Sequence, residues 1–322
     1  MAETLTARRF ERFLKGREFM HEIVLPALEM CTPEERFSSV RRCGTIVNVL
    51  QCDSCGTKHW KGFVRCKSKF CVPCSSVKTK IWLSKLVPIL AEQIENGNHV
   101  SLLSLTLVNH EIGQLGIMID RLNDAWRIMT HGNGNVKKWN QLILGGVRSL
   151  EVKLGEDGNW HAHFHALIIH PKGRFYEWLK AEWEKASSCA MKMPKGSKVG
   201  SIHIKAIKTA QGSMRGVIEA VKYPMKPENG FWDNSQAVEE VVQTLPRRKQ
   251  TQSFGIVRHL VALVEQENDV DEKKLDDFIC QACGCTSATL HSELLRDVIS
   301  SGKLYDIPKS KIENSIPISE VV

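Results

Sequence analysis

The segment Trp160–His170, with the sequence WHAHFHALIIH, constrains the fold of this chain more than any other. His161, His163 and His165 alternate in it with apolar residues. Because successive side chains of a β-strand point to opposite faces, this spacing predicts a strand whose imidazoles share one face. A lone strand histidine is usually structural, but burying several imidazoles without partners is costly. We therefore predict a metal site on this face.

The length and charge of the chain only loosely limit the classes of protein to which it could belong. Its 322 residues are enough for about two domains with a sizeable core. The 44 basic and 36 acidic residues give a net charge of +8, which is compatible with a polyanionic partner without requiring one. We find no cationic and then apolar leader and no apolar run of about 18 residues, so we expect a soluble cytoplasmic protein.

Hydrophobic periodicity predicts strands interleaved with helices. The turn at 155–159 joins two of the strands into a hairpin. We therefore predict an α+β fold with a central, mostly antiparallel sheet and packed helices, in the manner of RNA-recognition folds. The predicted strands cover 100–108, 147–154, 160–170 and 201–207, and the predicted helices cover 4–30, 78–95, 115–130, 174–190 and 212–223.

Eleven cysteines fall in clusters along the chain. Cys52 and Cys55 form one CxxC pair, and a second pair follows after fifteen residues at Cys71 and Cys74. In a leaderless protein such pairs are typical of metal sites rather than of disulfides. The spacing predicts one tetrahedral structural zinc in a zinc-knuckle module. Three further residues are spare ligands that could replace one of the four: Cys43, Cys66 and His59.

A second group of cysteines lies near the C-terminus. Cys280, Cys283 and Cys285 are followed six residues later by His291. These residue types can hold zinc. Their spacing is irregular, so unliganded thiols are the alternative.

The chain has three tyrosines, and Tyr223 differs from the other two. Tyr176 lies in an amphipathic helical pattern, where core packing explains it, and Tyr305 lies near the tail. Tyr223 ends the run VIEAVKY, in which Glu219 lies four residues earlier. This spacing places both side chains on one helical face.

Together these residue types suit phosphoryl transfer. Cleaving a phosphodiester requires a nucleophile and charge neutralisation on the scissile phosphate. A histidine-bound divalent cation supplies Lewis acidity. A tyrosine phenol can attack phosphorus if a cation or base helps it to lose its proton. A nearby carboxylate could later activate water to release the covalent intermediate.

Three segments resemble motifs of the rolling-circle replication initiators of small bacterial plasmids, which belong to the HUH endonuclease group. LSLTLVN at 103–109 is similar to the first motif, and WHAHFHAL at 160–167 is similar to the second, with His163 and His165 as its histidine pair. EAVKYPMK at 219–226 is similar to the third motif, in the type with one tyrosine and a glutamate four residues before it.

The resemblance implies a role for each motif residue. Tyr223 would nick the origin, leaving a 5′-phosphotyrosine and a free 3′-hydroxyl that the host polymerase extends, with a host helicase as a further partner. Glu219 would assist hydrolysis at termination. His163 and His165 would hold Mg²⁺ or Mn²⁺, with a third ligand from Glu151 or, alternatively, His161.

The resemblance also implies that a lysine contacts the phosphate or the phenolate, and two lysines compete for this role. Pro224 follows Tyr223, and a residue before proline is biased away from helical geometry. This puts Lys226 in doubt as a residue on the same face, and Lys222 could take its place.

We expect four segments along the chain. An N-terminal helical segment covers 1–42, a zinc module covers 43–78, an HUH nicking and joining domain covers 79–264, and a charged linker with a small Cys-containing region covers 265–322. Origin recognition would use double-stranded DNA and cleavage single-stranded DNA, with phosphate contacts from the zinc module and from LPRRKQTQ at 245–252.

Three other functions remain open at this point. The first is a transposase or conjugative relaxase built on the same site, although the chain has no GxxxxGK[ST] motif of a fused helicase. The second is a non-catalytic zinc-dependent DNA-binding regulator. The third is a zinc hydrolase acting on small molecules, whose expected acidic motifs are missing.

Overall fold

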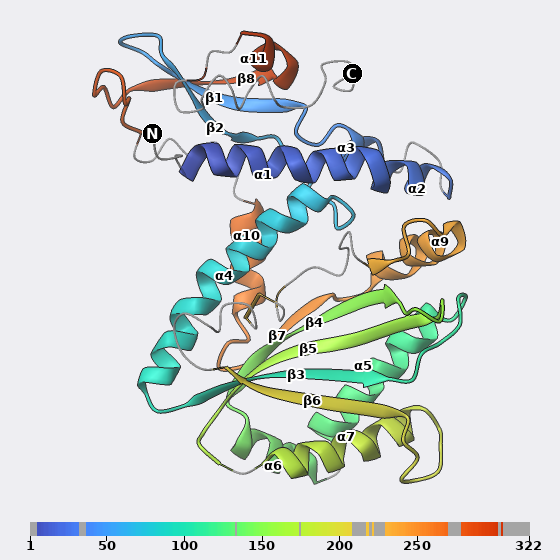
Figure 1. Cartoon of the computed structure of the whole chain (residues 1–322). Helices are drawn as coiled ribbons and strands as arrows, with labels where there is room; N and C mark the ends of the chain where they lie inside the picture. The colour runs from blue at the N-terminus through green and yellow to red at the C-terminus, as the bar shows by residue number, and fades with distance from the viewer. Residues whose placement is uncertain are drawn as a thin grey trace. The chain divides into compact units, whose positions relative to one another are not determined.

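The chain forms two compact units in a computed structural model (Figure 1). The terminal unit combines Met1–Ser75 with Asn268–Val322, and the central unit is Ser76–Glu267. Within the described part of the chain, no helix is both long enough and apolar enough to cross a membrane. The structure describes residues 5–31, 37–132, 134–173, 175–207, 217, 218, 221, 229–269, 278–301 and 304.

The central unit is built on a five-stranded sheet with the order β6-β3-β5-β4-β7. Every neighbouring pair is antiparallel, and the histidine strand β5 lies in the middle. The predicted α+β fold, with an antiparallel sheet and packed helices, is confirmed. The strands are β3 (His99–Leu107), β4 (Gly145–Leu154), β5 (Trp160–His170), β6 (Gly200–Ile207) and β7 (Thr251–Gly255).

One face of this sheet is covered by apolar helix surfaces. Trp126 of α5 (Leu115–His131) packs edge to face on Phe164 of β5, with ring centroids 6.2 Å apart. Trp183 of α7 (Tyr176–Ala190) is fully buried, and its indole N–H donates to the carbonyl of Thr106. The short helix α6 (Asn135–Leu142) follows α5, and all three helices lie on the same side of the sheet (Figure 1).

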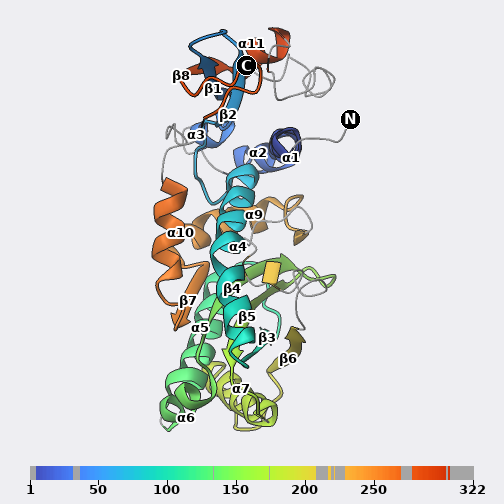
Figure 2. The same cartoon turned by 90° about the vertical axis from the view of Figure 1, so that its left-hand side faces the viewer.

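The opposite face of the sheet has an apolar half and a polar half. The apolar half packs against α4 (Val72–Glu95) and α10 (Leu260–Asp269), which lie side by side in Figures 1 and 2. The polar half carries Ser104, Glu151, His163 and His165 further along the same strands. The buried residues of the apolar half include Val100, Leu102, Val147, Leu167, Ile169, Trp82, Leu86, Leu260, Val264, Val217 and Val221.

Three features of the central unit differ from the sequence prediction. The helix predicted from 78 begins six residues earlier, at Val72. The charged segment expected to start a linker at 265 continues α10 to Asp269, because Leu260 and Val264 bury on the sheet. The helices α6, α9 (Ser235–Thr244) and α10, the 3₁₀ turn η4 (Leu245–Arg247) and strand β7 were not predicted.

The terminal unit has its own three-stranded antiparallel sheet, with the order β2-β1-β8. The helix predicted over 4–30 contains a π-helical segment before Pro26, a residue with no N–H to donate. Phe13 stacks on Phe63 with centroids 3.9 Å apart in the core. The elements are α1 (Leu5–Phe19), η1 (Met20–Val24), α2 (Leu25–Glu29), α3 (Ser38–Arg41), β1 (Ile46–Cys52), β2 (Lys58–Phe63), β8 (Ala288–Leu294) and α11 (Leu295–Ser301).

Candidate metal centre

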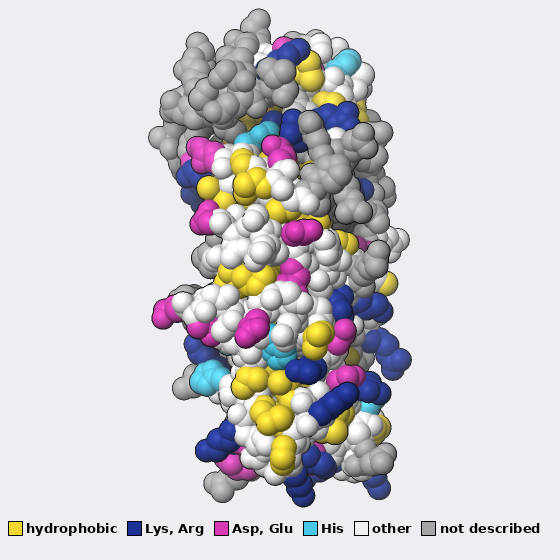
Figure 3. All heavy atoms as spheres, turned by 90° about the vertical axis from the view of Figure 1, so that its right-hand side faces the viewer, with side chains coloured by type: hydrophobic (Ala, Val, Ile, Leu, Met, Phe, Trp, Pro, Cys, Tyr) yellow, Lys and Arg dark blue, Asp and Glu magenta, His cyan; other side chains and the backbone are white. Residues whose placement is uncertain are grey.

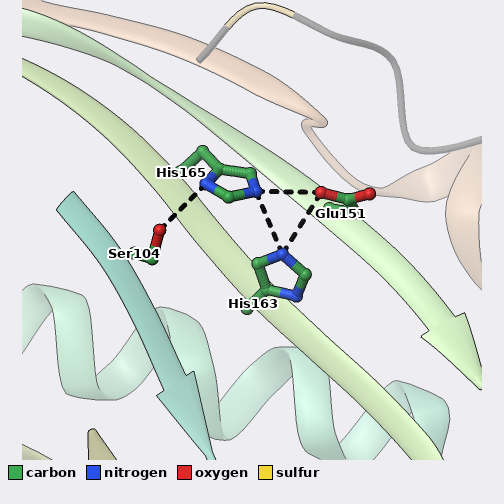
Figure 4. A network of polar contacts seen from close by, with 4 residues as sticks. All are labelled: Ser104, Glu151, His163 and His165. Carbon is green, nitrogen blue, oxygen red and sulfur yellow. Dashed lines mark hydrogen bonds and ion pairs between the residues drawn. The ribbon is translucent and has the colours of Figure 1, made fainter. Parts of the chain in front are cut away.

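Two imidazoles and one carboxylate converge on the polar half of the central sheet (Figure 4). The Nε2 atoms of His163 and His165 lie 3.1 Å apart. Oε2 of Glu151 lies 3.2 Å from the first of these nitrogens and 2.9 Å from the second. The antiparallel register explains the approach, since Glu151 of β4 stands directly opposite His163 of β5. We name these three residues the metal triad.

The metal triad is largely removed from water. The side chains of His163, His165 and Glu151 are 8%, 13% and 14% exposed. Burial lowers the pKa of His163, the hydrogen bond that its ring donates to Glu151 raises it, and the charge of His165 lowers it further. The neutral imidazole, which is the ligand form, is therefore favoured. A buried carboxylate beside neutral rings is costly unless a cation balances it.

Ser104 of β3 holds the second histidine of the triad from the far side of the ring. Its Oγ lies 3.2 Å from Nδ1 of His165. The register places Ser104 directly opposite His165, on the same face of the sheet. A metal bound at Nε2 leaves the proton on Nδ1, so the ring would donate to the serine. Among the described residues, Nδ1 of His163 has no such partner.

His161 stands apart from the metal triad. Its Nδ1 lies 2.8 Å from Oδ1 of Asn109, the last residue of the LSLTLVN segment. The amide of Asn109 in turn donates to Asp157 in the turn before β5. Burial lowers the pKa of His161, and the neighbouring His163 lowers it further. The structure therefore brings Glu151, rather than His161, to the two histidines.

The donor set of the metal triad suits a catalytic cation. Three protein ligands leave positions free for water or substrate, unlike the closed tetrahedra of structural sites. A carboxylate beside two imidazoles moves the preference toward Mg²⁺ or Mn²⁺ relative to an all-nitrogen site. The three ligand atoms lie within 4.8 Å of one another, close enough to share one ion.

The predicted nucleophile and its partners fall outside the described residues. These are Glu219, Lys222, Tyr223 and Lys226. Two described residues of the same segment, Val217 and Val221, are helical and buried in the apolar half of the face that carries the metal triad.

The structure regroups the cysteines, and the predicted partners of the two CxxC pairs are wrong. Cys71 and Cys74 join Cys43 and Cys66, which the sequence offered only as spares. We name this set the buried cluster. Cys52 and Cys55 join Cys280 and Cys283 instead, and we name that set the split cluster. The spacing along the chain revealed each pair but not its partner, because strand pairing across the unit decides which pairs meet.

Two residues proposed for a C-terminal cluster lie outside the sets that the structure brings together. Cys285 contacts the hydroxyl of Ser54, and His291 lies in β8 opposite Val49. His59, one of the spares, approaches Cys280 with its Nε2 3.4 Å from the sulfur.

The buried cluster has the dimensions of a zinc site. Sγ of Cys43 lies 3.4 Å from that of Cys71 and 3.5 Å from that of Cys74, and Cys66 lies 3.8 Å from Cys74. A tetrahedron with zinc–sulfur bonds of about 2.3 Å has edges of about 3.8 Å. Burial lowers the pKa of Arg17, while the neighbouring Cys43 and Cys71 raise it. Its Nη1 has no hydrogen-bond partner among the described residues, so a thiolate cluster would balance a buried charge.

Comparison with known proteins identifies a family for this chain. The model of the Rep_1 family, described as replication protein, matches residues 58–288. The chain is 23% identical over 246 residues to "Protein rep" of Streptococcus pneumoniae serotype 2, covering 73% of this chain and 74% of that protein. It is 22% identical over 272 residues to "Protein rep" of Lentilactobacillus hilgardii, covering 76% and 83%. No solved structure is a significant match. The family match spans well over half of the sequence, and this chain belongs to the replication protein family.

Proposed function

We propose that this chain initiates rolling-circle replication of a plasmid by nicking one strand of the origin in a metal-dependent reaction. The observation that supports this most is the convergence of His163, His165 and Glu151 on one point of the central sheet. The membership of the replication protein family supports the biological role. The catalytic domain is then of the HUH type, with an RNA-recognition-like sheet.

In this proposal Tyr223 is the nucleophile. Its phenolate oxygen bonds to the scissile phosphorus, the bond from phosphorus to the 3′ oxygen breaks, and that oxygen takes up a proton to become a free 3′-hydroxyl. A phenol has an ordinary pKa of about 10, so Lys222 or Lys226 would favour the phenolate. At termination Glu219 would take a proton from the water that attacks the phosphotyrosine.

The metal triad would hold Mg²⁺ or Mn²⁺, and the bound ion would neutralise charge on the scissile phosphate. Ser104 would keep the ring of His165 in its ligating orientation. Burial of the triad side chains would exclude bulk water and strengthen the electrostatic contacts made there. The burial of Val217 and Val221 over the same face supports a helical segment that delivers Tyr223 to this face.

Basic side chains on β6 and in the segment before it suit a DNA backbone. Lys192, Lys195 and Lys198 are exposed in the segment between α7 and β6, and Lys205 is exposed on β6. The register places Lys205 opposite Leu102, on the face that carries the metal triad. In Figure 3, lysine and arginine side chains gather in the lower part of the view, with acidic side chains among them. We propose that these cations contact phosphates of the single-stranded substrate, while origin recognition uses double-stranded DNA.

A denaturing gel tests the nucleophile. The purified chain is incubated with single-stranded origin oligonucleotide and Mn²⁺, and the DNA-linked protein band is measured. We expect Tyr223→Phe to abolish the band, since no phenol remains to bond phosphorus. Glu219→Ala should keep the band and slow its release by water.

Matched variants separate this chemistry from a general loss of folding. Tyr176→Phe should leave the band intact, because the Tyr176 hydroxyl contacts Ser101 on the other face of β3. His163→Ala with His165→Ala should lose the band. A full-strength band from Tyr223→Phe would refute the nucleophile, and an undiminished band from the double histidine variant would refute the metal role.

A further inference from the structure

The split cluster joins residues from the two ends of the chain. Cys52 ends β1 and Cys55 lies in the turn that follows, while the other two members lie a few residues before β8. More than two hundred residues separate these pairs along the sequence. All four sulfurs nevertheless lie within 4.8 Å of one another. The members of the split cluster are Cys52, Cys55, Cys280 and Cys283.

We propose that the split cluster binds a second zinc ion, which fastens the C-terminal segment onto the β1–β2 hairpin. Sγ of Cys52 lies 3.5 Å from that of Cys283, and Sγ of Cys55 lies 3.6 Å from that of Cys280. These separations are close to the edge of a zinc–thiolate tetrahedron, about 3.8 Å. Four soft thiolates in this arrangement select zinc over hard cations such as Mg²⁺.

The backbone forms the same turn at both cysteine pairs. Each pair has the sequence CxxCG, and its glycine adopts the left-handed conformation, with φ of 69° at Gly56 and 76° at Gly284. A side chain at that φ would be strained, so glycine is the residue that the turn favours. In each turn the glycine N–H donates to the carbonyl of the first cysteine, at 2.9 Å and 2.7 Å. Two matching turns facing each other form a zinc-ribbon arrangement.

Groups around the split cluster support its thiolate form and its geometry. His59 is buried, and its Nε2 lies 3.4 Å from the sulfur of Cys280, where an N–H could donate to a bound thiolate. Asp53 accepts hydrogen bonds from the hydroxyls of Ser287 and Thr289, which ties the first turn to the start of β8. The strands β1 and β8 then continue in register from Cys52 opposite Ala288.

The split cluster differs from the buried cluster in its exposure. Cys55 and Cys283 are exposed, whereas Cys43, Cys71 and Cys74 are all buried. Ligand atoms that face solvent can be attacked directly by a chelator. We therefore expect the zinc of the split cluster to leave first, and the two ions to be released in two phases.

The zinc content of the purified 322-residue chain tests the proposal without DNA. We expect two zinc ions per chain in the parent and one in the double variant Cys280→Ser, Cys283→Ser. The matched controls are Cys285→Ser, two residues from a ligand, and Cys189→Ser, an exposed cysteine in α7. Both controls should keep two ions. One zinc in the parent, two in the double variant, or iron in place of the second zinc would overturn the proposal.

Thiol alkylation of the parent chain covers the case in which the double variant does not fold. With zinc bound, Cys280 and Cys283 should resist alkylation, while Cys189 reacts; after chelation they should react as well. Alkylation of Cys280 and Cys283 at the rate of Cys189 in the zinc-loaded chain would overturn the proposal. A chain with two zinc ions that forms no DNA adduct would refute the nicking proposal alone.

Discussion

At the scale of single residues, the register of the central sheet determines which side chains meet at the metal triad. Alternation puts His163 and His165 on one face, and antiparallel pairing sets Glu151 opposite the first and Ser104 opposite the second. The resemblance to the initiator family, together with the predicted hairpin, pointed to Glu151 as a third ligand, with His161 as the alternative. Ser104 could not be found that way, because its contact depends on a pairing between β3 and β5 that no local pattern reveals.

The hydrogen bond from Ser104 to His165 predicts a specific effect on metal binding. Ser104→Ala should lower the affinity for Mn²⁺ by about 10- to 100-fold, because the ring loses the partner that fixes its orientation. Titration calorimetry with Mn²⁺ measures this.

Ser101→Ala is the matched control. Ser101 makes the same kind of contact, 3.0 Å to Nε2 of His170, on the same two strands but on the other face. Its loss should reduce the free energy of unfolding by about 1 kcal/mol and leave Mn²⁺ affinity unchanged. Equal affinity losses in both variants would show that Ser104 acts only through stability.

At the scale of secondary-structure elements, strong hydrophobic periodicity identified most strands and helices of the central unit. The short ones were missed. Strand β7 has five residues and pairs with the start of β4. Helix α9 follows the segment that carries the predicted nucleophile, and its packing partners are distant in sequence. Its Glu240 accepts hydrogen bonds from the backbone N–H groups of Gly113 and Leu115 and from the indole of Trp160, at 2.7, 2.5 and 2.6 Å.

Glu240 therefore caps a helix that lacks a cap of its own. Gln114, the N-cap residue of α5, makes no side-chain capping bond, and the carboxylate of Glu240 also meets the positive end of the helix dipole. Glu240→Ala should reduce the free energy of unfolding by about 2 kcal/mol or more, since three donors lose a charged acceptor. Chemical denaturation measures this.

The neighbouring Glu239→Ala is the control for Glu240→Ala. Glu239 is exposed and accepts only a bond from Gln243 of its own helix among the contacts described for its carboxylate. Its replacement should change the free energy of unfolding by less than about 0.5 kcal/mol. Equal losses in the two variants would contradict the capping role.

At the scale of the whole molecule, the two units have separate cores and separate groups of candidate metal ligands. The two cysteine clusters belong to the terminal unit, and the metal triad belongs to the central unit. The sequence showed clustered cysteines at both ends of the chain. It could not show that β1 and β8 pair, because sheet pairing between distant segments depends on tertiary packing rather than on local spacing.

Removing zinc should therefore affect one unit and spare the other. After treatment with a chelator under reducing conditions and removal of the chelator, calorimetry should show a lower melting temperature for the terminal unit, because bound zinc stabilises the folded thiolate sites. The transition of the central unit and its Mn²⁺ affinity should stay unchanged. Loss of Mn²⁺ binding together with zinc would contradict this separation.

The most direct test of the central claim is to identify the amino acid that becomes linked to DNA. The adduct formed with Mn²⁺ is digested with protease and nuclease, and the peptide that carries the residual 5′-phosphate is sequenced by mass spectrometry. We expect phosphotyrosine at Tyr223, formed by the parent chain and lost in the variant that lacks His163 and His165. A phosphate linked to Tyr176, to Tyr305 or to a serine would contradict it.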